Sequence, residues 1–363
     1  MSRVVYLHVG APKTGTTYLQ DRLALNRTAL ARHDVHYPLN LHASQFRPAL
    51  DLLQMPWGGL QEDVEGEWDA LAARVRRLSG TVLLSHEILA AARPAQVRRA
   101  MAGLDGAEVH LVYSARDLAR QIPAEWQEGV KHQRKIGFGG FLKQVQTSRR
   151  TRPTLWFWRV QSLPDVLGRW ARTLPPERVH LVTVPQAGAP RDLLWQRYCR
   201  AFGVDPAWAP DESERENVSI GAAETFLLRR LNRRLRSAGL PSQEYRRLVR
   251  ELVVHQTLAK RPAMTRVTLP PTAFDWAESV TEEWLDWVRA SGVDVVGDLD
   301  DLRPVRPRPD QRWVDPDRPR RVEMVDAAVD AMVALALEAA NRPDPDQQLP
   351  ARIGRAVRRL RGR

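Results

Sequence analysis

Residues 8–17 read His-Val-Gly-Ala-Pro-Lys-Thr-Gly-Thr-Thr, and this stretch decides the fold. Val4–Val9 is a short apolar run rich in β-branched residues, which predicts a buried strand. After Gly15, apolar residues recur every three or four positions, which predicts a helix. A strand, a glycine-bounded loop and a helix N-terminus form an anion site, because unpaired backbone N–H groups and the helix dipole point toward the loop. The sequence therefore predicts a phosphate-binding loop near its N-terminus.

This loop departs from the common nucleotide-binding sequence Gly-x4-Gly-Lys-Ser/Thr at one position that matters for its chemistry. Gly10 and Gly15 keep the spacing, and Thr17 stands where the Ser or Thr belongs. Thr16 occupies the lysine position, and the lysine of this loop is instead Lys13, three residues earlier. We expect Lys13 to reach a phosphate-sized group from the loop rather than from the first helical turn.

The segment Pro12-Lys13-Thr14-Gly15-Thr16-Thr17 after a strand resembles the 5′-phosphosulfate loop of the sulfotransferases that use 3′-phosphoadenosine 5′-phosphosulfate (PAPS). The resemblance implies a three-layer α/β/α P-loop fold with a mostly parallel central sheet. It also implies transfer of a sulfuryl group from PAPS to a hydroxyl, or less often an amine, of a carbohydrate, lipid or small-molecule acceptor. All six residues would then bind the co-substrate, Lys13 would also be catalytic, and no metal would be required. An accidental Gly/Thr turn and a diverged nucleotide kinase are the alternatives.

The composition is compatible with an anionic ligand. The 363 residues carry a formal net charge of +12, which suits a nucleotide with several phosphates, nucleic acid or an anionic membrane surface. The single cysteine, Cys199, excludes an internal disulfide and a cysteine-based metal cluster, and we expect it to be buried and inert. We find neither the apolar region of a signal peptide nor a run near the ~18 apolar residues of a membrane span. We therefore expect a cytoplasmic protein.

Thr81–Leu84 predicts a second core strand, which ends at Ser85-His86-Glu87. Because ligands bind at the carboxyl ends of parallel strands, these residues should face the crevice of the phosphate loop. Cytosolic small-molecule sulfotransferases have Lys-Thr-His at the comparable strand end, and the resemblance implies that His86 is the general base, although Leu84 replaces the lysine. Other branches of the superfamily use a glutamate, so Glu87 is a second candidate. A capping Ser with a solvated His–Glu pair is the structural alternative; we favour His86.

Glu108–Ser114 predicts a third strand, and residues 178–184 predict a fourth. The following Ala115-Arg116-Asp117 resembles the 3′-phosphate motif of the same superfamily, which implies that Arg116 binds that phosphate; arginine suits bidentate phosphate binding. The family motif has a serine eight residues later, where this chain has Ala124. The missing hydroxyl contact could come from Arg120 or Gln121 on the same predicted helix. A salt bridge between Arg116 and Asp117 is the alternative.

Three further segments are candidates for the rim of this site. A loop of the superfamily that closes over the 3′-phosphate or adenine implies binding roles for Arg215, Asn217 and Ser219, with helix capping as the alternative. Residues 39–66 read as a loop, either a substrate lid or an ordered surface excursion. Residues 131–140 are basic and glycine-punctuated, which suits a mobile loop or a solvated one. Trp156-Phe157-Trp158 is interpreted as core packing.

The resemblance covers about Arg3 to Arg303, and we predict a sulfotransferase-like domain over 1–303, a Pro/Arg-rich linker over 304–320 and a helical appendage with a basic tail over 321–363. Val322–Ala339 predicts an amphipathic helix with Val322, Val325, Val329, Met332 and Leu335 on one stripe. Residues 352–363 carry six arginines, which suit an anionic membrane or nucleic acid; a solvated tail is the alternative. An ATP-dependent kinase and a non-catalytic nucleotide or anion binder remain alternative functions.

Overall fold

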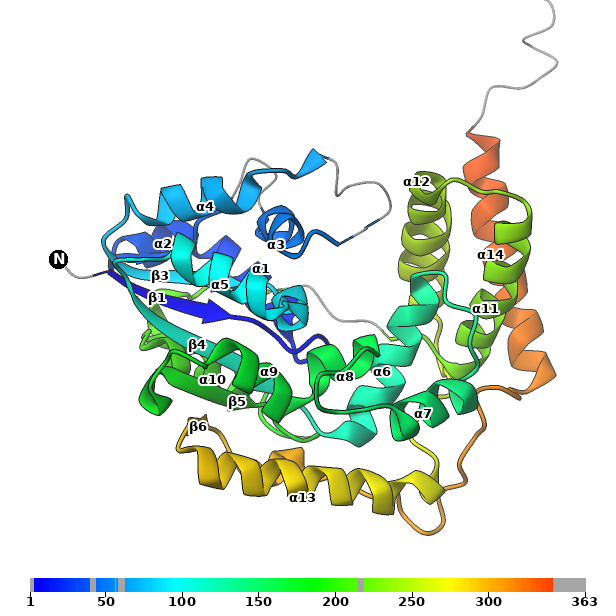
Figure 1. The fold of residues 1–363 in the computed structure, drawn as a ribbon. Coiled ribbons are helices and arrows are strands. Elements are labelled where there is room, and N and C mark those ends of the chain that lie inside the picture. Colours follow the sequence, from blue (N-terminus) through cyan, green and yellow to red (C-terminus); the bar gives the residue numbers. More distant parts are fainter. Residues whose placement is uncertain (1–2, 40–43, 56, 58–62, 214–218, 342–363) are drawn as a thin grey trace, which may run out of the picture. The chain divides into compact units, whose positions relative to one another are not determined.

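A computed structural model describes residues 3–39, 44–55, 57, 63–213 and 219–341 (Figure 1). The chain divides into two compact units. The first comprises Met1–Gly129, Ile136–Ser219 and Val267–Asp315, and the second comprises Val130–Lys135, Ile220–Arg266 and Pro316–Arg363. In the described part of the chain, no helix has both the length and the apolar composition needed to cross a membrane.

The first unit is built on a six-stranded, entirely parallel sheet in the order β2-β3-β1-β4-β5-β6 (Figure 1). The strands are β1 (Arg3–His8), β2 (Val35–His36), β3 (Gly80–Ser85), β4 (Glu108–Ala115), β5 (Val179–Thr183) and β6 (Asp294–Val296). Their nearly continuous apolar runs are typical of parallel strands that are covered on both faces. The predicted three-layer α/β/α fold with a parallel sheet is confirmed.

Helices cover both faces of this sheet. α1 (Thr16–Leu25), α2 (Arg27–Ala31) and α10 (Leu193–Phe202) share one buried cluster with Leu83, Val112 and Val182 of the sheet. On the other face, α9 (Leu163–Trp170) contacts β4 and α5 (Pro94–Gly103), and α8 (Trp156–Gln161) accepts a 2.9 Å hydrogen bond from Tyr113 to its Val160 carbonyl. The connection from β1 to β2 runs across the sheet in the opposite direction from those through α5 and through α8 and α9, so right-handed crossovers place α1 and α2 on one face and α5, α8 and α9 on the other.

Other elements of the first unit surround this centre. They are α3 (Phe46–Leu53), α4 (Glu67–Val75), η2 (Glu87–Ala91), α6 (Leu118–Lys131, whose last residues belong to the second unit), α7 (Phe138–Thr147), η3 (Pro176–Arg178), η4 (Pro206–Trp208), η7 (Pro271–Ala273), α13 (Phe274–Ser291) and η8 (Leu299–Leu302). Of the three residues expected in the core, Phe157 and Trp158 are buried, whereas Trp156 is half-buried. Cys199 is buried, as expected, which raises the pKa of its thiol to about 12.

Two local predictions need correction. The single helix expected after the loop is divided at Asn26 into α1 and α2, because the Asn26 amide donates to the carbonyls of Arg22 and Asp211. Residues 39–66 are not all loop, since α3 lies among them. Pro48 is compatible with α3 because it falls in the first turn, where the backbone N–H has no helical partner. Residues 40–43, 56 and 58–62 lie outside the described residues, and the lid role stays a prediction.

The second unit is helical within its described residues. It contains α11 (Ala222–Ser237), α12 (Ser242–Glu244), the π-helical η5 (Tyr245–Thr257), η6 (Leu258–Lys260) and α14 (Arg321–Ala340). α14 contacts α11 and η5, and Arg261 pairs with both Glu224 and Asp330 to link η6, α11 and α14. These contacts group the 220–260 region with the 321–340 helix, which the sequence analysis assigned to different parts of the chain.

Candidate active site

The phosphate loop lies at the carboxyl edge of the sheet between β1 and β4. The chain leaves β1 toward β2 on one side and leaves β4 toward β5 on the other, so this is the switch point at which open α/β sheets bind ligands. The loop is fixed to β4 by hydrogen bonds from the backbone N–H of Val9 to Val112 (3.0 Å) and from that of Ala11 to Ser114 (2.8 Å). The loop therefore lies at the edge of the sheet where ligands bind in this class of fold, and its role in phosphate binding stays a prediction.

The two glycines of the loop are required by its backbone. Gly10 has a φ of +115°, and a Cβ there would lie 2.9 Å from the Glu87 carbonyl oxygen. Gly15 has a φ of +87°, and a Cβ there would lie 2.7 Å from a methyl group of Leu194. Both positions therefore favour glycine on conformation, and Gly10 also on space, because the atom that a Cβ would meet there belongs to the backbone of Glu87.

The loop presents a run of available backbone donors. Lys13 and Gly15 both have positive φ, a pattern found in the backbone concavities that bind anions. Within the described part of the chain, the first backbone N–H after the loop that donates a backbone hydrogen bond is that of Leu19, to the Gly15 carbonyl (3.0 Å). The N–H groups of residues 15–18 thus remain as donors for an anion at the N-terminus of α1.

Lys13 forms an ion pair that the sequence did not predict. Its Nζ lies 2.6 Å from Oε2 of Glu128, and the two side chains are 28% and 23% exposed. Glu128 lies on α6, one helical turn after Ala124, where the family motif has serine. In the sequence, the one indication that Glu128 faces the site is its spacing from Ala124. Residues four positions apart lie on the same face of a helix.

The other residues of the loop either form buried hydrogen bonds or lie at the start of α1. The Thr14 hydroxyl is buried and donates to the Ala11 carbonyl (2.6 Å), and it also lies 2.6 Å from the Ser114 hydroxyl. The carbonyl of Pro12 accepts hydrogen bonds from the amides of Gln121 and Gln161. Thr16 is buried and Thr17 is half-buried at the start of α1.

A buried histidine, whose role the sequence analysis did not assign, joins the three strands around the loop. His8 Nδ1 lies 2.8 Å from the Ser85 hydroxyl on β3, and its Nε2 lies 3.1 Å from the Ser114 hydroxyl on β4. Burial lowers the pKa of His8 to about 4, so its imidazole is neutral near pH 7. Two hydroxyls on flanking strand ends therefore hold His8 as a neutral crosslink beneath the loop.

His86 and Glu87 lie at the end of β3, and their contacts differ in kind. His86 is buried, and its Nδ1 accepts a hydrogen bond from the Ile88 N–H (3.3 Å) as the N-cap of η2. In this tautomer the proton lies on Nε2, so the lone pair of the ring is already used by the cap. The cap proposed as the structural alternative is therefore present, but it is made by His86 rather than by Ser85.

Glu87 has the properties of an ionised group near Lys13. Its Oε2 accepts a 2.9 Å hydrogen bond from the Gln20 amide. Burial by itself raises the pKa of Glu87, but His86, a backbone N–H, Gln20 and the positive charge of Lys13 together bring the pKa below its ordinary value. Burial lowers the pKa of His86, against the opposing effect of Glu87. Near pH 7 the carboxylate is therefore charged and the imidazole neutral.

Arg116 lies beside the phosphate loop. Its Nη1 donates to the Lys13 carbonyl at 3.4 Å, and the residue is half-buried. Asp117 forms its ion pair with Arg120 and also accepts a 2.9 Å hydrogen bond from the Arg120 N–H. The expected alternative, an Arg116–Asp117 pair, is thus replaced by an Asp117–Arg120 pair at the start of α6.

The two substitutes expected for the missing serine have other contacts. Besides Asp117, the Arg120 guanidinium donates to the carbonyls of Pro185 (2.8 Å) and Val184 (3.3 Å) at the end of β5. Gln121 is fully buried and holds the Pro12 carbonyl. Ala124 itself is half-buried. The structure therefore brings Lys13, Glu87, Glu128 and Arg116 around the loop, whereas Arg120 and Gln121 act as supports.

The remaining candidates are less informative. Arg215 and Asn217 lie outside the described residues, and Ser219 is exposed. Within the described ranges, no group of three or more His, Cys, Asp and Glu side chains is arranged to hold a metal ion. The binding roles of these three residues and the absence of a metal requirement stay predictions.

Comparison with known proteins adds little. No family model and no curated protein matches the sequence. A solved structure of a sulfotransferase from Alicyclobacillus acidocaldarius is similar at 16% sequence identity, over 67% of this chain and 98% of that chain, with a TM-score of 0.36. A TM-score at this level is too low to carry an argument about the activity of this chain.

Proposed function

We propose that this protein is a PAPS-dependent sulfotransferase, acting on a hydroxyl or amine of a carbohydrate, lipid or small molecule. The observation that carries the proposal is the pairing of two anion-binding features at the β1/β4 switch point. One is the loop with Lys13 and its available N–H groups, and the other is Arg116, which reaches the carbonyl of Lys13. PAPS carries its anionic groups at two places, the 5′-phosphosulfate and the 3′-phosphate, and so requires two such features.

In the proposed reaction, the acceptor oxygen or nitrogen forms a bond to the sulfur of PAPS. The bond between sulfur and the bridging oxygen of the 5′-phosphate breaks, and adenosine 3′,5′-bisphosphate leaves with that electron pair. Lys13 and the loop N–H groups neutralise the charge that develops on the leaving phosphate. The residues proposed to hold the 5′-phosphosulfate are those of the loop 12–17, in which Thr14 contributes through its backbone because its hydroxyl is already bonded.

We assign the general base to Glu87, in preference to His86. The assignment is supported by the Nδ1 of His86, which is occupied by the helix cap, whereas the carboxylate of Glu87 is ionised near pH 7 and has lone pairs available. The lowered pKa that keeps Glu87 ionised also makes it a weaker base than a carboxylate with a raised pKa would be. In this scheme His86 is a positioning residue that fixes the turn at the end of β3.

For the 3′-phosphate we retain Arg116 as the principal ligand. Arg120 is proposed only as a support for α6, because its guanidinium already holds Asp117 and the end of β5. Arg215, Asn217 and Ser219 remain proposed ligands on the strength of the sequence resemblance. The predicted cytoplasmic location likewise stays a prediction.

Thermal shift with adenosine 3′,5′-bisphosphate, the expected product, tests the proposal. At about 100 times Kd the ligand should stabilise the protein by about 2.7 kcal/mol, which corresponds to a rise in Tm of roughly 5 °C. AMP, which lacks the 3′-phosphate, should give a smaller shift, and magnesium should not be needed. Equal shifts with AMP would remove the 3′-phosphate part of the proposal, and a larger, magnesium-dependent shift with ATP would favour the kinase. Transfer of radiolabelled sulfate from PAPS to an acceptor separates an enzyme from a non-catalytic binder.

A further inference from the structure

The positive charge of this protein is concentrated in its second unit. Residues 130–135, 220–266 and 316–363 hold 24 Lys and Arg residues against 10 Asp and Glu residues, a formal charge of +14. The larger first unit holds 31 against 33. Without residues 342–363, the second unit still holds 17 against 8. The unit that contains the phosphate loop therefore does not account for the basic character of the chain, and the basic helical unit needs an explanation of its own.

α14 in this unit has its apolar face outward. Of the nine large hydrophobic side chains that are exposed in the described part of the chain, seven lie on this helix: Val322, Val325, Val329, Met332, Val333, Leu335 and Leu337. The packed face of α14 instead carries alanines and ion-paired carboxylates. Ala327 and Ala331 are buried, and Asp330 and Glu338 pair with Arg261 and Arg247. Such a face, on a helix about 30 Å long, normally needs an apolar partner.

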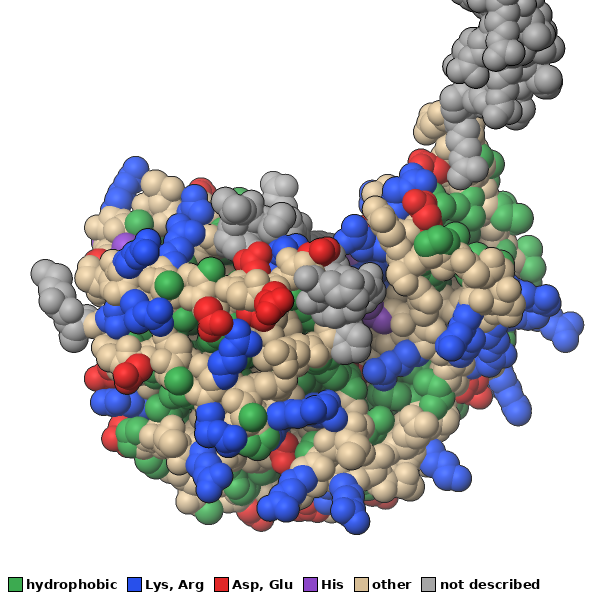
Figure 2. Space-filling view, turned by 45° about the horizontal axis from the view of Figure 1, so that its top comes forward, with side chains coloured by type: hydrophobic (Ala, Val, Ile, Leu, Met, Phe, Trp, Pro, Cys, Tyr) green, Lys and Arg blue, Asp and Glu red, His purple; other side chains and the backbone are tan. Residues whose placement is uncertain are grey.

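The outer face of α14 is wide and almost without charge. At 100° per residue, its exposed apolar side chains cover more than half of the helix circumference, and Asp326 is the one acidic residue among them. Figure 2 shows hydrophobic side chains (green) gathered at the upper right of the view, with Lys and Arg side chains (blue) nearby. A stripe of this width is broader than the a/d seam of a two-stranded coiled coil.

A groove beside this face combines apolar walls with a cation. It has a volume of about 400 Å³, and its lining includes Lys260 and Arg261 together with Val333 and Leu337 of α14. Arg261 is paired with Glu224 and Asp330, whereas Lys260 is exposed and forms no ion pair with any residue that the structure describes. The groove therefore offers a positive charge next to apolar side chains.

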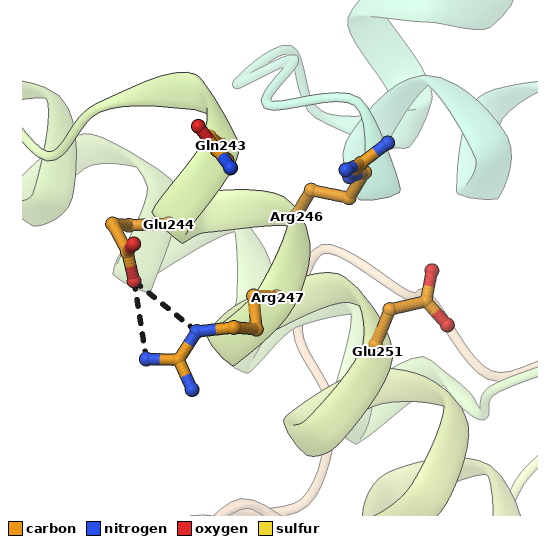
Figure 3. A pocket seen from close by; sticks show the side chains of 5 residues that line it. All are labelled: Gln243, Glu244, Arg246, Arg247 and Glu251. Carbon is orange, nitrogen blue, oxygen red and sulfur yellow. Dashed lines mark hydrogen bonds and ion pairs between the residues drawn. The ribbon is translucent and has the colours of Figure 1, made fainter.

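A second concavity of the unit, of about 360 Å³, serves as a contrast. It is lined by Gln243, Glu244, Arg246, Arg247 and Glu251. Figure 3 shows Glu244 reaching Arg247, while Arg246 and Glu251 extend on the other side. Two carboxylates balance two guanidinium groups here, so this concavity has no net attraction for an anion.

We propose that the second unit binds the surface of an anionic lipid bilayer, with the outer face of α14 at the boundary between headgroups and acyl chains and Lys260 at a lipid phosphate. An aliphatic helix face beside a high positive charge is the combination that binds such surfaces. Nucleic acid would match the charge but not the aliphatic face. A second copy of this unit would match the aliphatic face, but two units that each carry a formal charge of +14 would repel one another. The proposal does not depend on the sulfotransferase activity.

Vesicle sedimentation of the full chain tests this proposal. We expect binding to vesicles of equal parts phosphatidylglycerol and phosphatidylcholine, and at least about tenfold weaker binding to phosphatidylcholine alone. The double variant Val325→Glu/Val329→Glu should weaken binding to the anionic vesicles by at least about tenfold. The matched control is Val305→Glu in the first unit, where the valine is 66% exposed compared with 60% for Val325; it should leave binding within about twofold. Lys260→Gln should weaken binding about fivefold.

A second measurement does not depend on the stability of the glutamate variants. Because Cys199 is buried, Val329→Cys introduces an accessible thiol that can carry an environment-sensitive fluorophore. Its emission should shift to the blue on the anionic vesicles, and that of a label at Val305→Cys should not. The proposal is overturned if wild-type protein binds neither vesicle, or if the label at 329 reports no apolar environment. It is also overturned if light scattering shows a dimer that the double variant abolishes without any vesicle binding, or if duplex DNA binds while the vesicles do not.

Discussion

The ion pair between Lys13 and Glu128 leads to a prediction about nucleotide affinity. In the structure the Lys13 ammonium, which we propose to bind the phosphosulfate, is 2.6 Å from the Glu128 carboxylate. A phosphate must therefore compete with this carboxylate for Lys13. We predict that Glu128→Gln binds adenosine 3′,5′-bisphosphate more tightly than the wild type does.

The exposure of the pair sets the magnitude. Both side chains are about a quarter exposed (28% and 23%), so solvent screens the pair and we take its strength as about 1 kcal/mol. Removing the competing charge should then lower Kd roughly fivefold. The gain should shrink near 1 M salt, where the Debye length is about 3 Å.

Isothermal titration calorimetry on wild type and Glu128→Gln measures the difference. Glu108→Gln is a matched control, because Glu108 pairs with Arg178 at 3.2 Å but lies at the amino end of β4, the opposite edge of the sheet. In a Lys13→Ala background, Glu128→Gln should lose most of its effect on nucleotide affinity, since the ion pair with Lys13 is gone. Affinity in Glu128→Gln that is equal to or weaker than wild type would refute the reasoning and would make Glu128 a support that positions Lys13.

Four further outcomes are expected. Lys13→Ala should keep the fold by circular dichroism but lose nucleotide affinity and about 10²–10³ in turnover. Glu87→Gln should lower kcat by about 10²–10⁴. His86→Ala should mainly lower the free energy of unfolding by about 1 kcal/mol, because a helix cap is lost. If His86→Ala lowers kcat more than Glu87→Gln does, His86 and not Glu87 is the general base. Ala124→Ser should be tolerated at its half-buried site and tighten the bisphosphate by about 0.5–1.5 kcal/mol, and an unchanged Kd in calorimetry would contradict this. Because the pKa of His8 is lowered to about 4, the unfolded chain binds a proton below about pH 6.5 that the folded chain does not bind. The free energy of unfolding should therefore fall as the pH drops below about 6.5, by roughly 2 kcal/mol at about pH 5. Urea unfolding at about pH 7 and at about pH 5 measures this difference, and equal stability at the two pH values would contradict it.

The local features of the site follow from the sequence. The glycine spacing at Gly10 and Gly15 and the apolar runs before residues 86 and 116 depend on backbone conformation and burial, which are properties of short segments. The parallel order then brings the carboxyl ends of β1, β3 and β4 to one edge, because register aligns His8 with Ser85 and Val112. The prediction of one site shared by three distant segments could therefore be made without coordinates.

The roles within that site required the tertiary structure. Glu128 meets Lys13 across 115 positions of sequence, and only the packing of α6 beside the loop brings the two charges together. His86 and Glu87 cannot be distinguished by sequence, because the direction of each side chain depends on the turn into η2 and on the Gln20 amide of α1.

The same limit applies to α14. Its periodicity defines an apolar stripe, but a period states only which residues share a face, not which face is packed. In the fold, small alanines allow close approach to α11 and η5, and Asp330 and Glu338 find arginine partners there. The aliphatic stripe is consequently left on the outside. Sequence determines what each segment can bury, and tertiary packing determines what it does bury, because the partners that compete for each face come from segments far apart in the chain.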